Sequence, residues 1–402
     1  MIRTDVAVVG GGPGGVATAI GLARAGRQVV LLDKARFPRD KCCGDGLTTG
    51  ALRLLEDLGL EPTPGWREVD AAWVRSPSGR TVEFPLPAHM GQFAAVVPRV
   101  ELDAALIDLA RAEGVKVHDG HGFVGLQPAH AGETAIEAEG LGTIAARYVV
   151  AADGMWSPVR KAHGIGQVGY LGEWHAFRQY FDHVDGSSAQ RLWVWFEPDL
   201  LPGYAWSFPL PGGRANVGFG IPRDGVRRVQ DMKALWPELL ARPHIAEAIG
   251  PEAVAAAPHK AWPIPARVDR TVLARGRTLF VGDAARACDP LTGEGIGQAL
   301  LTGSLAARAI VAAGALRPEV AREGYERLVR REWVPDHRMA AALSRLLRHQ
   351  EVARGAIRLA GTSDWTRRSF GRWLFEDEPR AAALTPTRWH RQFLGRPGAF
   401  AS

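Results

Sequence analysis

The sequence contains few cysteines and no long hydrophobic run. Three cysteines occur in 402 residues, two of them adjacent at Cys42 and Cys43, and none has the spacing of a zinc site. We therefore expect neither a disulfide framework nor a bound metal. No stretch approaches the roughly 20 apolar residues that span a bilayer, and residues 1–5 lead directly into a strand without a targeting signal. These absences predict a cytoplasmic protein.

The composition is that of a globular protein with a basic surface. Hydrophobic residues make up 46% and charged residues 23%, and a length of 402 residues predicts two joined domains. The formal net charge is +6, with some concentration of Arg from Arg317 onward. No nucleic-acid motif accompanies these arginines, so a nucleic-acid partner is not expected. A solvated basic surface and attraction to anionic lipid headgroups both remain open.

The hydrophobic pattern alternates between helices and strands in a way that indicates a parallel sheet. Residues 5–33 read as strand, glycine turn, helix and strand, and helices follow at 49–58 and 99–113. From 174 to 221 the pattern becomes alternating and aromatic, which favours an inserted antiparallel sheet. A further strand covers 278–281. A long helix follows Gly295, and the tail from Arg317 is expected to be helical.

The first glycine-rich turn has the full context of a dinucleotide-binding loop. It runs from Gly10 to Gly15 between a strand and a helix, and Asp33 ends the next strand. The free N–H groups of the helix start suit phosphates, while an acidic residue can accept from ribose hydroxyls. The loop alone does not separate FAD from NAD. The predicted contacts in this region are Gly10, Gly12, Pro13, Gly14, Gly15, Asp33, Lys34 and Arg36.

Two later segments favour FAD. The segments 152–160 (ADGMWSPVR) and 281–285 (VGDAA) resemble, in order and spacing, the DG and GD motifs of the p-hydroxybenzoate-hydroxylase-like flavoprotein superfamily. Either alone could be a strand-end turn. The resemblance implies that Asp283 hydrogen-bonds the ribityl chain, that Arg99 contacts the cofactor near its phosphates, and that the turn 293–296 lies at the flavin N1–C2=O edge. The further cofactor contacts that it implies are Cys43, Gly44, Arg99, Asp153, Asp283, Gly293, Gly295 and Ile296.

A narrower resemblance concerns the geranylgeranyl reductase family within that superfamily. It is carried by segments 41–48 (KCCGDGLT), 202–209 (PGYAWSFP) and 289–296 (DPLTGEGI). This family uses FAD to saturate isoprenoid double bonds in membrane lipids, chlorophyll side chains and quinone tails, and its YxWxFP segment lines the lipid cavity. In this sequence the Pro before the Tyr is one residue closer than the family's usual PxxY. The resemblance implies a hydrophobic or lipid substrate bound by Tyr204, Trp206, Phe208 and Pro209.

The predicted reaction requires a proton as well as a hydride. Reduced flavin can deliver hydride to an alkene carbon, and an isolated alkene must then receive a proton almost at once. Cys43 is the candidate catalytic residue because it lies beside the glycine turn expected to approach the flavin, although it could simply pack there. Tyr204, Trp206 and Phe208 share one face of a predicted strand, and that face is either core or cavity. The Trp-rich and Arg-rich tail is either a packed helical cap or a peripheral membrane contact.

Other functions remain open at this point. A flavin monooxygenase would hydroxylate or epoxidise a small hydrophobic compound, and a non-enzymatic flavin protein is also compatible. Residues 193–198 (WVWFEP) resemble the WxWxIP signature of flavin-dependent halogenases with Glu197 in place of Ile, but the turn 43–46 lacks the GES-type sequence of that class. Only one GxGxxG is present. The electrons would therefore come from transiently bound NAD(P)H or from a separate donor protein.

These observations predict an α/β protein with a Rossmann-like FAD-binding domain, an inserted antiparallel-sheet substrate domain and a helical C-terminal region. The expected boundaries are 1–75, 99–170 and 271–318 for the FAD-binding domain, 76–98 and 171–270 for the substrate domain, and 319–402 for the helical region.

Overall fold

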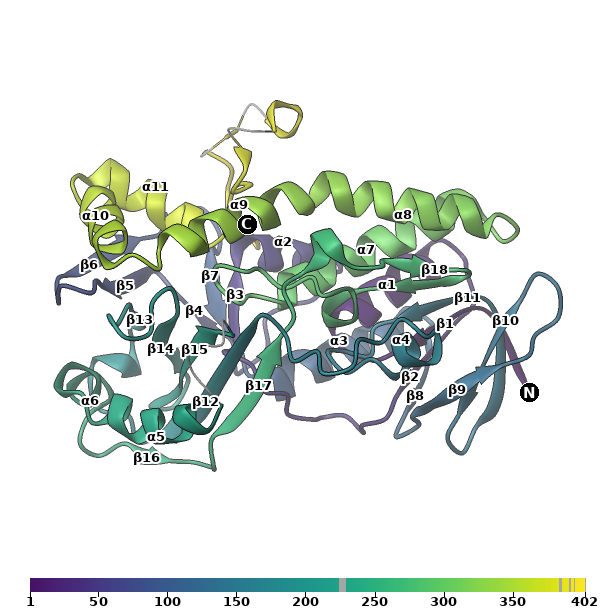
Figure 1. The fold of residues 1–402 in the computed structure, drawn as a ribbon, viewed down its shortest axis with the longest axis horizontal. Helices are drawn as coiled ribbons and strands as arrows, with labels where there is room; N and C mark the ends of the chain where they lie inside the picture. The colour runs from purple at the N-terminus through teal and green to yellow at the C-terminus, as the bar shows by residue number, and fades with distance from the viewer. Residues whose placement is uncertain (224–228, 383–384, 390–391, 394, 402) are drawn as a thin grey trace.

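The computed structural model describes residues 1–402 except 224–228, 383–384, 390–391, 394 and 402. A parallel sheet lies at one end of the long axis and an antiparallel sheet at the other (Figure 1). The C-terminal helices run along one side of both sheets. This arrangement confirms the predicted fold class.

The parallel sheet has the strand order β18-β19-β11-β1-β2-β8, in which β18 at the edge is antiparallel to β19. Strand β10 pairs antiparallel with β11, and β9 pairs antiparallel with β10. The central strands of the sheet are nearly continuous apolar runs, and they form one hydrophobic cluster with the neighbouring helices and with β9 and β10. The strands are β1 (Ile2–Val9), β2 (Val29–Asp33), β8 (Lys116–Asp119), β9 (Phe123–Gln127), β10 (Thr134–Ala138), β11 (Gly142–Ala151), β18 (Ala274–Arg275) and β19 (Thr278–Phe280).

The register of this sheet brings three distant motifs together. Val9 pairs with both Leu32 and Ala151, and Ala151 pairs with Phe280. Because these strands are parallel, the loops that follow them leave the same edge of the sheet. Ligands of such folds bind at this edge. The segments after β1, β2, β11 and β19 are those in which the sequence motifs were found.

Helices pack closely against this edge. Gly303 in α7 faces Gly14 in α1, and a Cβ at Gly303 would lie 2.2 Å from the carbonyl oxygen of Gly14. By length and composition α7 could cross a membrane, contrary to the expectation from the sequence, but 72% of this helix is buried inside the fold. The helices of this region are α1 (Pro13–Arg24), α2 (Thr49–Asp57), α3 (Arg99–Ala112), α4 (Pro158–Ala162), α7 (Ile296–Ala313) and α8 (Pro318–Glu332).

The antiparallel sheet has the order β16-β12-β15-β14-β13-β5-β6, with β17 beside β12. It takes in β5, which begins at Ala71 before the expected boundary at 76 and pairs with β13. Its strands are β5 (Ala71–Arg75), β6 (Thr81–Pro85), β12 (Trp174–Asp182), β13 (Leu192–Trp195), β14 (Tyr204–Leu210), β15 (Arg214–Pro222), β16 (Val254–Ala255) and β17 (Lys260–Ile264). A small sheet, β3 (Gly46–Thr48), β7 (Ala94–Val96) and β4 (Arg67–Glu68), lies between the two larger ones.

Helices cover the two sides of the antiparallel sheet. Helices α5 (Val229–Leu240) and α6 (Pro243–Ile249) form one hydrophobic cluster with β12 and β15. On the other side, α9 (Val334–Leu346) leads to α10 (Gln350–Ala360) and α11 (Asp364–Leu374), which lie over β5 and β6 (Figure 1). The rings of Phe84 and Phe370 are 4.6 Å apart at this contact. Helices α10 and α11 of the tail are therefore packed as a helical cap on this sheet.

Candidate active site

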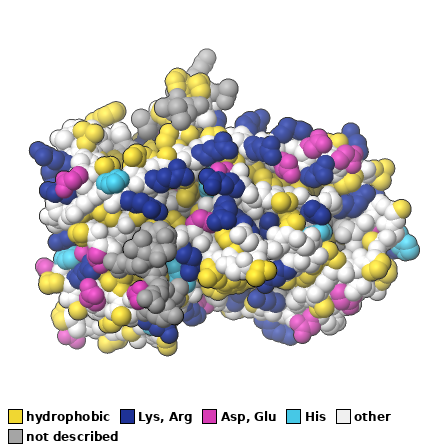
Figure 2. All heavy atoms as spheres, in the orientation of Figure 1, with side chains coloured by type: hydrophobic (Ala, Val, Ile, Leu, Met, Phe, Trp, Pro, Cys, Tyr) yellow, Lys and Arg dark blue, Asp and Glu magenta, His cyan; other side chains and the backbone are white. Residues whose placement is uncertain are grey.

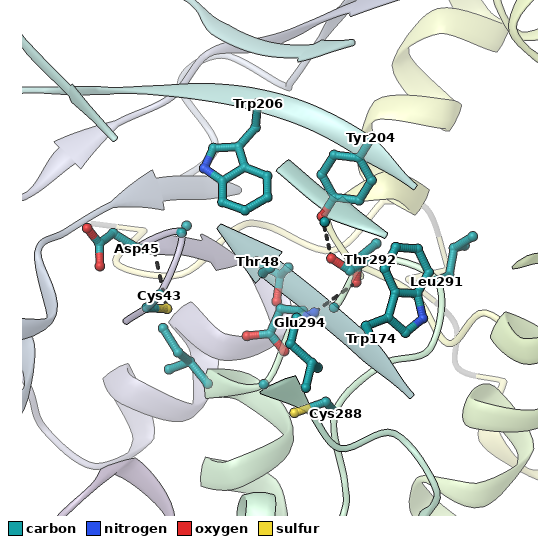
Figure 3. Close-up of a pocket in the computed structure, with 18 of the residues that line it drawn as sticks. Cys43, Asp45, Thr48, Trp174, Tyr204, Trp206, Cys288, Leu291, Thr292 and Glu294 are labelled. Atoms are coloured by element: carbon teal, nitrogen blue, oxygen red, sulfur yellow. Dashed lines mark hydrogen bonds between the residues drawn. The ribbon is translucent and has the colours of Figure 1, made fainter. Parts of the chain in front are cut away.

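A cavity of about 400 Å³ extends from the glycine turn of β1 and α1 to the C-terminal helices. Its walls come from the turn 41–48, strand β14, the turn 291–296, and helices α9, α10 and α11. In Figure 3, Tyr204 and Trp206 lie on one side of this space, and Cys43, Glu294 and Cys288 lie across it. The cavity thus joins the predicted cofactor loop to the predicted substrate segment.

The glycine turn leaves room for a ligand. A Cβ at Gly15 would lie 1.9 Å from the carbonyl oxygen of Gly10, so the turn requires a glycine there. At Gly12 a Cβ would meet only a guanidinium nitrogen of Arg39, at 3.9 Å, which leaves the backbone open. Gly12 is the N-cap of α1, and within the described residues no side chain caps this helix. Open N–H groups at a helix start fit a pyrophosphate.

The acidic residues of the predicted cofactor site differ in what they contact. Asp33 accepts from the N–H of Gly11 at 2.7 Å and thereby holds the glycine turn. Asp153 accepts from Ser157 Oγ at 2.7 Å and from the N–H of Val159 at 2.9 Å, so its carboxylate holds the start of α4. Burial raises the pKa of Asp153 to about 6. Its neighbours Ala152 and Gly154, rather than Asp153, line the cavity.

Lys34 and Arg36 follow β2 and are exposed outside the cavity lining. Arg36 lies instead against Gly120, where a Cβ would approach its Nε to 3.1 Å. Both residues lie beside the carboxyl end of β2, where the loops of the sheet edge begin. Their contact with a cofactor remains a prediction.

Asp283 lies at the cavity wall within a small charged group. Its Oδ2 accepts from Lys41 Nζ at 3.2 Å, and its Oδ1 accepts from the thiol of Cys288 at 3.3 Å. Burial alone would raise the pKa of Asp283, but Lys41 holds that pKa below its ordinary value. The carboxylate is therefore ionised at neutral pH and suited to accept from a ribityl hydroxyl.

The turn before α7 also faces the cavity. Gly293 and Gly295 line it together with Ile296, the first residue of α7. Gly293 has φ of +72°, which favours glycine. The side chain of Asp289 accepts from the N–H groups of Leu291 and Thr292, both at 2.8 Å, and fixes the turn. A helix start in this place can stabilise negative charge on a ligand.

Arg99 is buried and lines the cavity, where it supplies a fixed positive charge. Its Nε and Nη2 donate to the two carboxylate oxygens of Asp103 at 2.9 and 2.8 Å. Burial opposes this charge, but Asp103 outweighs burial and raises the pKa of Arg99. Arg39 lies 2.8 Å from the same carboxylate, so two cations share one anion close to the open backbone of Gly12.

The aromatic segment lies on β14 and faces the cavity with every second residue. Tyr204, Trp206 and Phe208 line it, and neighbouring ring centroids are 5.9 and 6.0 Å apart. The hydroxyl of Tyr204 donates to the carbonyl oxygen of Thr292, which ties β14 to the turn before α7. Pro209 lies outside the cavity lining, because alternation along the strand directs it to the opposite face.

The turn containing Cys43 closes one end of the aromatic wall. A Cβ at Gly44 would lie 3.4 Å from the ring of Phe208, so turn and ring are in close contact. The thiol of Cys43 accepts from the N–H of Asp45 at 3.4 Å. Burial raises the pKa of this thiol, so Cys43 carries its proton at neutral pH. A neutral thiol can donate a proton but is a poor nucleophile.

Asp45 is a buried acid that the sequence did not indicate as a site residue. Its Oδ2 accepts from Tyr180 Oη at 2.6 Å and from Asn216 Nδ2 at 2.8 Å, and Asn216 Nδ2 also donates to the carbonyl oxygen of Cys43 at 2.8 Å. Trp206 Nε1 donates to Asn216 Oδ1 at 3.2 Å. Burial raises the pKa of Asp45 to about 6. The network thus links the cysteine turn to the aromatic wall.

A second missed feature is a pair of carboxylates, Glu294 and Glu376, of which Glu294 lines the cavity. Glu294 Oε1 accepts from the N–H of Gly297 at 2.8 Å, while its Oε2 is buried without a hydrogen-bond partner among the described residues. Burial first, and the charge of Glu376 second, raise the pKa of Glu294 to about 8. Glu376 in turn accepts from Arg380 at 2.9 Å. The pair therefore retains a proton at neutral pH, beside the turn expected to face the flavin.

The segment that resembles a halogenase signature turns its tryptophans away from the site. Leu192, Val194 and Phe196 line the cavity, whereas Trp193 and Trp195 stack on each other at 5.7 Å in the cluster on the opposite face. Glu197 is buried and accepts from Arg242 at 2.7 Å, which fixes the end of β13. The pattern is therefore ordinary strand alternation.

Comparison with known proteins agrees with this geometry. The FAD binding domain family matches residues 3–312. The chain is 32% identical over 336 residues to a menaquinone reductase of Mycolicibacterium smegmatis, covering 78% of this chain and 77% of the relative. It is 33% identical over 324 residues to digeranylgeranylglycerophospholipid reductase 1 of Methanopyrus kandleri, covering 77% and 80%.

The fold has a close counterpart among solved structures. A geranylgeranyl bacteriochlorophyll reductase-like protein from Thermoplasma acidophilum superposes with a TM-score of 0.80 and 22% identity, covering 97% of this chain and all of that one. The open backbone at Gly12, the ionised Asp283 and the helix start after Gly295 together fit FAD. On its motifs, its cavity and its relatives, this chain belongs to the geranylgeranyl reductase family of FAD-dependent oxidoreductases.

Proposed function

We propose that this enzyme saturates carbon–carbon double bonds in the isoprenoid chain of a lipid or a quinone. The observation that carries the proposal is the continuity of the cavity from the cofactor loop to the apolar walls of α9, α10 and α11. A long flexible hydrocarbon can lie in such a space with one double bond at the inner end. The relatives named for menaquinone and for digeranylgeranylglycerophospholipid reduction support the same substrate class.

The chain's own residues would bind the cofactor and orient the alkene. Gly12, Arg99, Asp283 and the turn before α7 would hold FAD, which in its reduced form supplies a hydride to one alkene carbon. Trp206 and the neighbouring rings of β14 would pack against the prenyl chain, hold its double bond next to the flavin and exclude water. The electrons that reduce FAD would come from NAD(P)H or from a donor protein.

The second alkene carbon must receive a proton, and two neutral groups at the cavity wall hold one. The thiol of Cys43 stays protonated because it is buried, and Glu294 stays protonated because burial and Glu376 disfavour its charge. Cys43 lies beside the aromatic wall, so we assign it the donor role. Glu294 lies on the far side of the cavity from Trp206 and could supply the proton that Cys43 loses.

The reoxidation of the flavin tests this function. The FAD-loaded enzyme, reduced with dithionite without oxygen, is mixed with a geranylgeranyl lipid or with its fully saturated phytanyl counterpart. We expect the flavin absorbance to return only with the unsaturated lipid. Equal reoxidation by both lipids, or none by either, would refute the proposal, and a requirement for oxygen with an oxygenated product would support the monooxygenase alternative.

A further inference from the structure

The corner formed by α9, α10 and α11 exposes several large apolar side chains. Leu346 is 53% exposed, Val352 41%, Leu359 70% and Trp365 70%. Single exposed apolar residues are common on any protein surface, but these four lie on three consecutive helices. Their grouping indicates a surface that meets an apolar partner.

Helix α10 carries two apolar stripes where a surface helix normally has one. Ala353, Ile357 and Ala360 are buried. The residues directly before these three are Val352, Ala356 and Leu359, and all of them are exposed. They form a second apolar stripe at helical spacing. Packing against the protein accounts for the first stripe only, so the second stripe is available to a partner.

This exposed surface is continuous with the substrate cavity. Leu346, Val352 and Ala356 are exposed and also line the cavity, so the cavity reaches the surface between the end of α9 and the start of α10. A hydrocarbon chain that entered here would leave one apolar environment only to enter another. The opening thus lies where a lipid substrate could pass in without crossing water.

The charge around the opening is positive. Residues 345–368 contain six arginines and two acidic residues. Glu351 pairs with Arg354 and Asp364 with Arg367, whereas the remaining four arginines have no ion-pair partner within the described part of the chain. Figure 2 shows Lys and Arg side chains gathered along the neighbouring α8 and α9, with hydrophobic side chains beside them. The unpaired arginines are Arg345, Arg348, Arg358 and Arg368.

We propose that the α9–α11 corner docks on an anionic lipid bilayer and that the isoprenoid chain enters the cavity directly from the membrane between Leu346 and Val352. The proposal rests on the proposed function in one respect, the lipid nature of the substrate. Exposed Trp and Leu side chains would insert at the headgroup level, and the arginines would contact lipid phosphates. A second copy of the chain fits this surface less well, because a twofold contact would bring the unpaired arginines of both copies together.

Binding of the FAD-loaded enzyme to vesicles tests the docking surface without turnover. Vesicles of phosphatidylcholine with and without phosphatidylglycerol are sedimented with the wild type, with Leu359→Ser/Trp365→Ser, and with Arg345→Gln/Arg348→Gln. None of these four residues lines the cavity. Val168→Ser, which removes a fully exposed apolar side chain elsewhere, and Arg3→Gln in β1, at the opposite end of the molecule, serve as controls.

We expect the wild type and both controls to bind the anionic vesicles and to release in high salt. Each lost arginine should weaken binding roughly fivefold, the equivalent of about 1 kcal/mol. Both double variants should keep their turnover of detergent-dispersed substrate and lose turnover of substrate embedded in vesicles. Unchanged vesicle binding in the double variants, equal loss in the controls, or a change of oligomeric state in place of lost binding would overturn the docking surface. Vesicle binding requires no reaction, so its outcome is separate from that of the flavin assay.

Discussion

Replacing Asp45 by Asn should remove a specific part of the pH dependence of stability. Asp45 is fully buried and accepts hydrogen bonds from Tyr180 and Asn216. Its φ is +65°, a conformation that Asn tolerates better than most residues, so the substitution suits the turn. The neutral amide cannot ionise, which isolates the effect of the charge.

The direction and the size of this change in stability with pH follow from the pKa of Asp45. Burial raises it from the ordinary 3.8 to about 6, so the folded state favours the protonated form. The associated stability is fully present below about pH 4 and is lost as the pH rises through about 6. Since each pKa unit corresponds to about 1.4 kcal/mol, the loss is about 3 kcal/mol. The asparagine variant keeps this amount at all pH values.

Denaturant unfolding between pH 4 and pH 8, at one fixed FAD concentration, measures this effect. The free energy of unfolding of the wild type relative to Asp45→Asn should fall by about 3 kcal/mol across that range. Other titrating groups are common to both proteins and cancel. Asp57→Asn, which removes an exposed carboxylate at the end of α2, serves as the control. A pH-independent difference between the wild type and Asp45→Asn would contradict this prediction.

Three further predictions address the cofactor, the cavity and the carboxylate pair. Gly15→Ala should abolish FAD uptake, measured by flavin absorbance, because the added Cβ would collide with the carbonyl oxygen of Gly10. The control Gly125→Ala adds a Cβ in open space and should bind FAD normally. Normal uptake by both variants would show that the turn does not require a glycine at position 15. Leu343 lines the cavity on α9, so the larger side chain in Leu343→Trp should lower kcat/KM more for geranylgeranyl than for geranyl substrates. Equal losses would mean that the prenyl chain of the substrate does not pass this residue. The pKa of Glu294 is raised from 4.5 to about 8, so the wild type should lose thermal stability as the pH rises from about 4.5 to about 8, and Glu294→Gln should lose less; parallel Tm curves would count against the shared proton.

The fold and the cofactor edge could be predicted because their determinants are local. Gly10 to Gly15, Asp33 and the segments after β11 and β19 are each short, and parallel strands necessarily bring such segments to one edge. The alternation of Tyr204, Trp206 and Phe208 likewise fixed their common face, and the structure assigns that face to the cavity. Pro209 was included from the motif alone, although its strand position directs it away.

The remaining features depend on contacts between residues far apart in the sequence. Asp45 meets Tyr180 and Asn216 only through the packing of the cysteine turn on the antiparallel sheet, and no local pattern indicates that contact. The partner of Glu294 lies after α11, in a tail that the sequence described only as a helical cap or a membrane contact. That the same tail lines the substrate cavity follows from its packing over β5 and β6.

The most direct test of the central claim is the mass of the product from a single turnover without oxygen. The FAD-loaded enzyme is reduced stoichiometrically and incubated with a menaquinone that carries an unsaturated side chain, and the lipid is extracted and analysed by mass spectrometry. We expect a gain of two hydrogens in the prenyl chain for each reduced FAD that is oxidised. An unchanged prenyl chain under these conditions, with an added oxygen atom once air is admitted, would contradict this expectation.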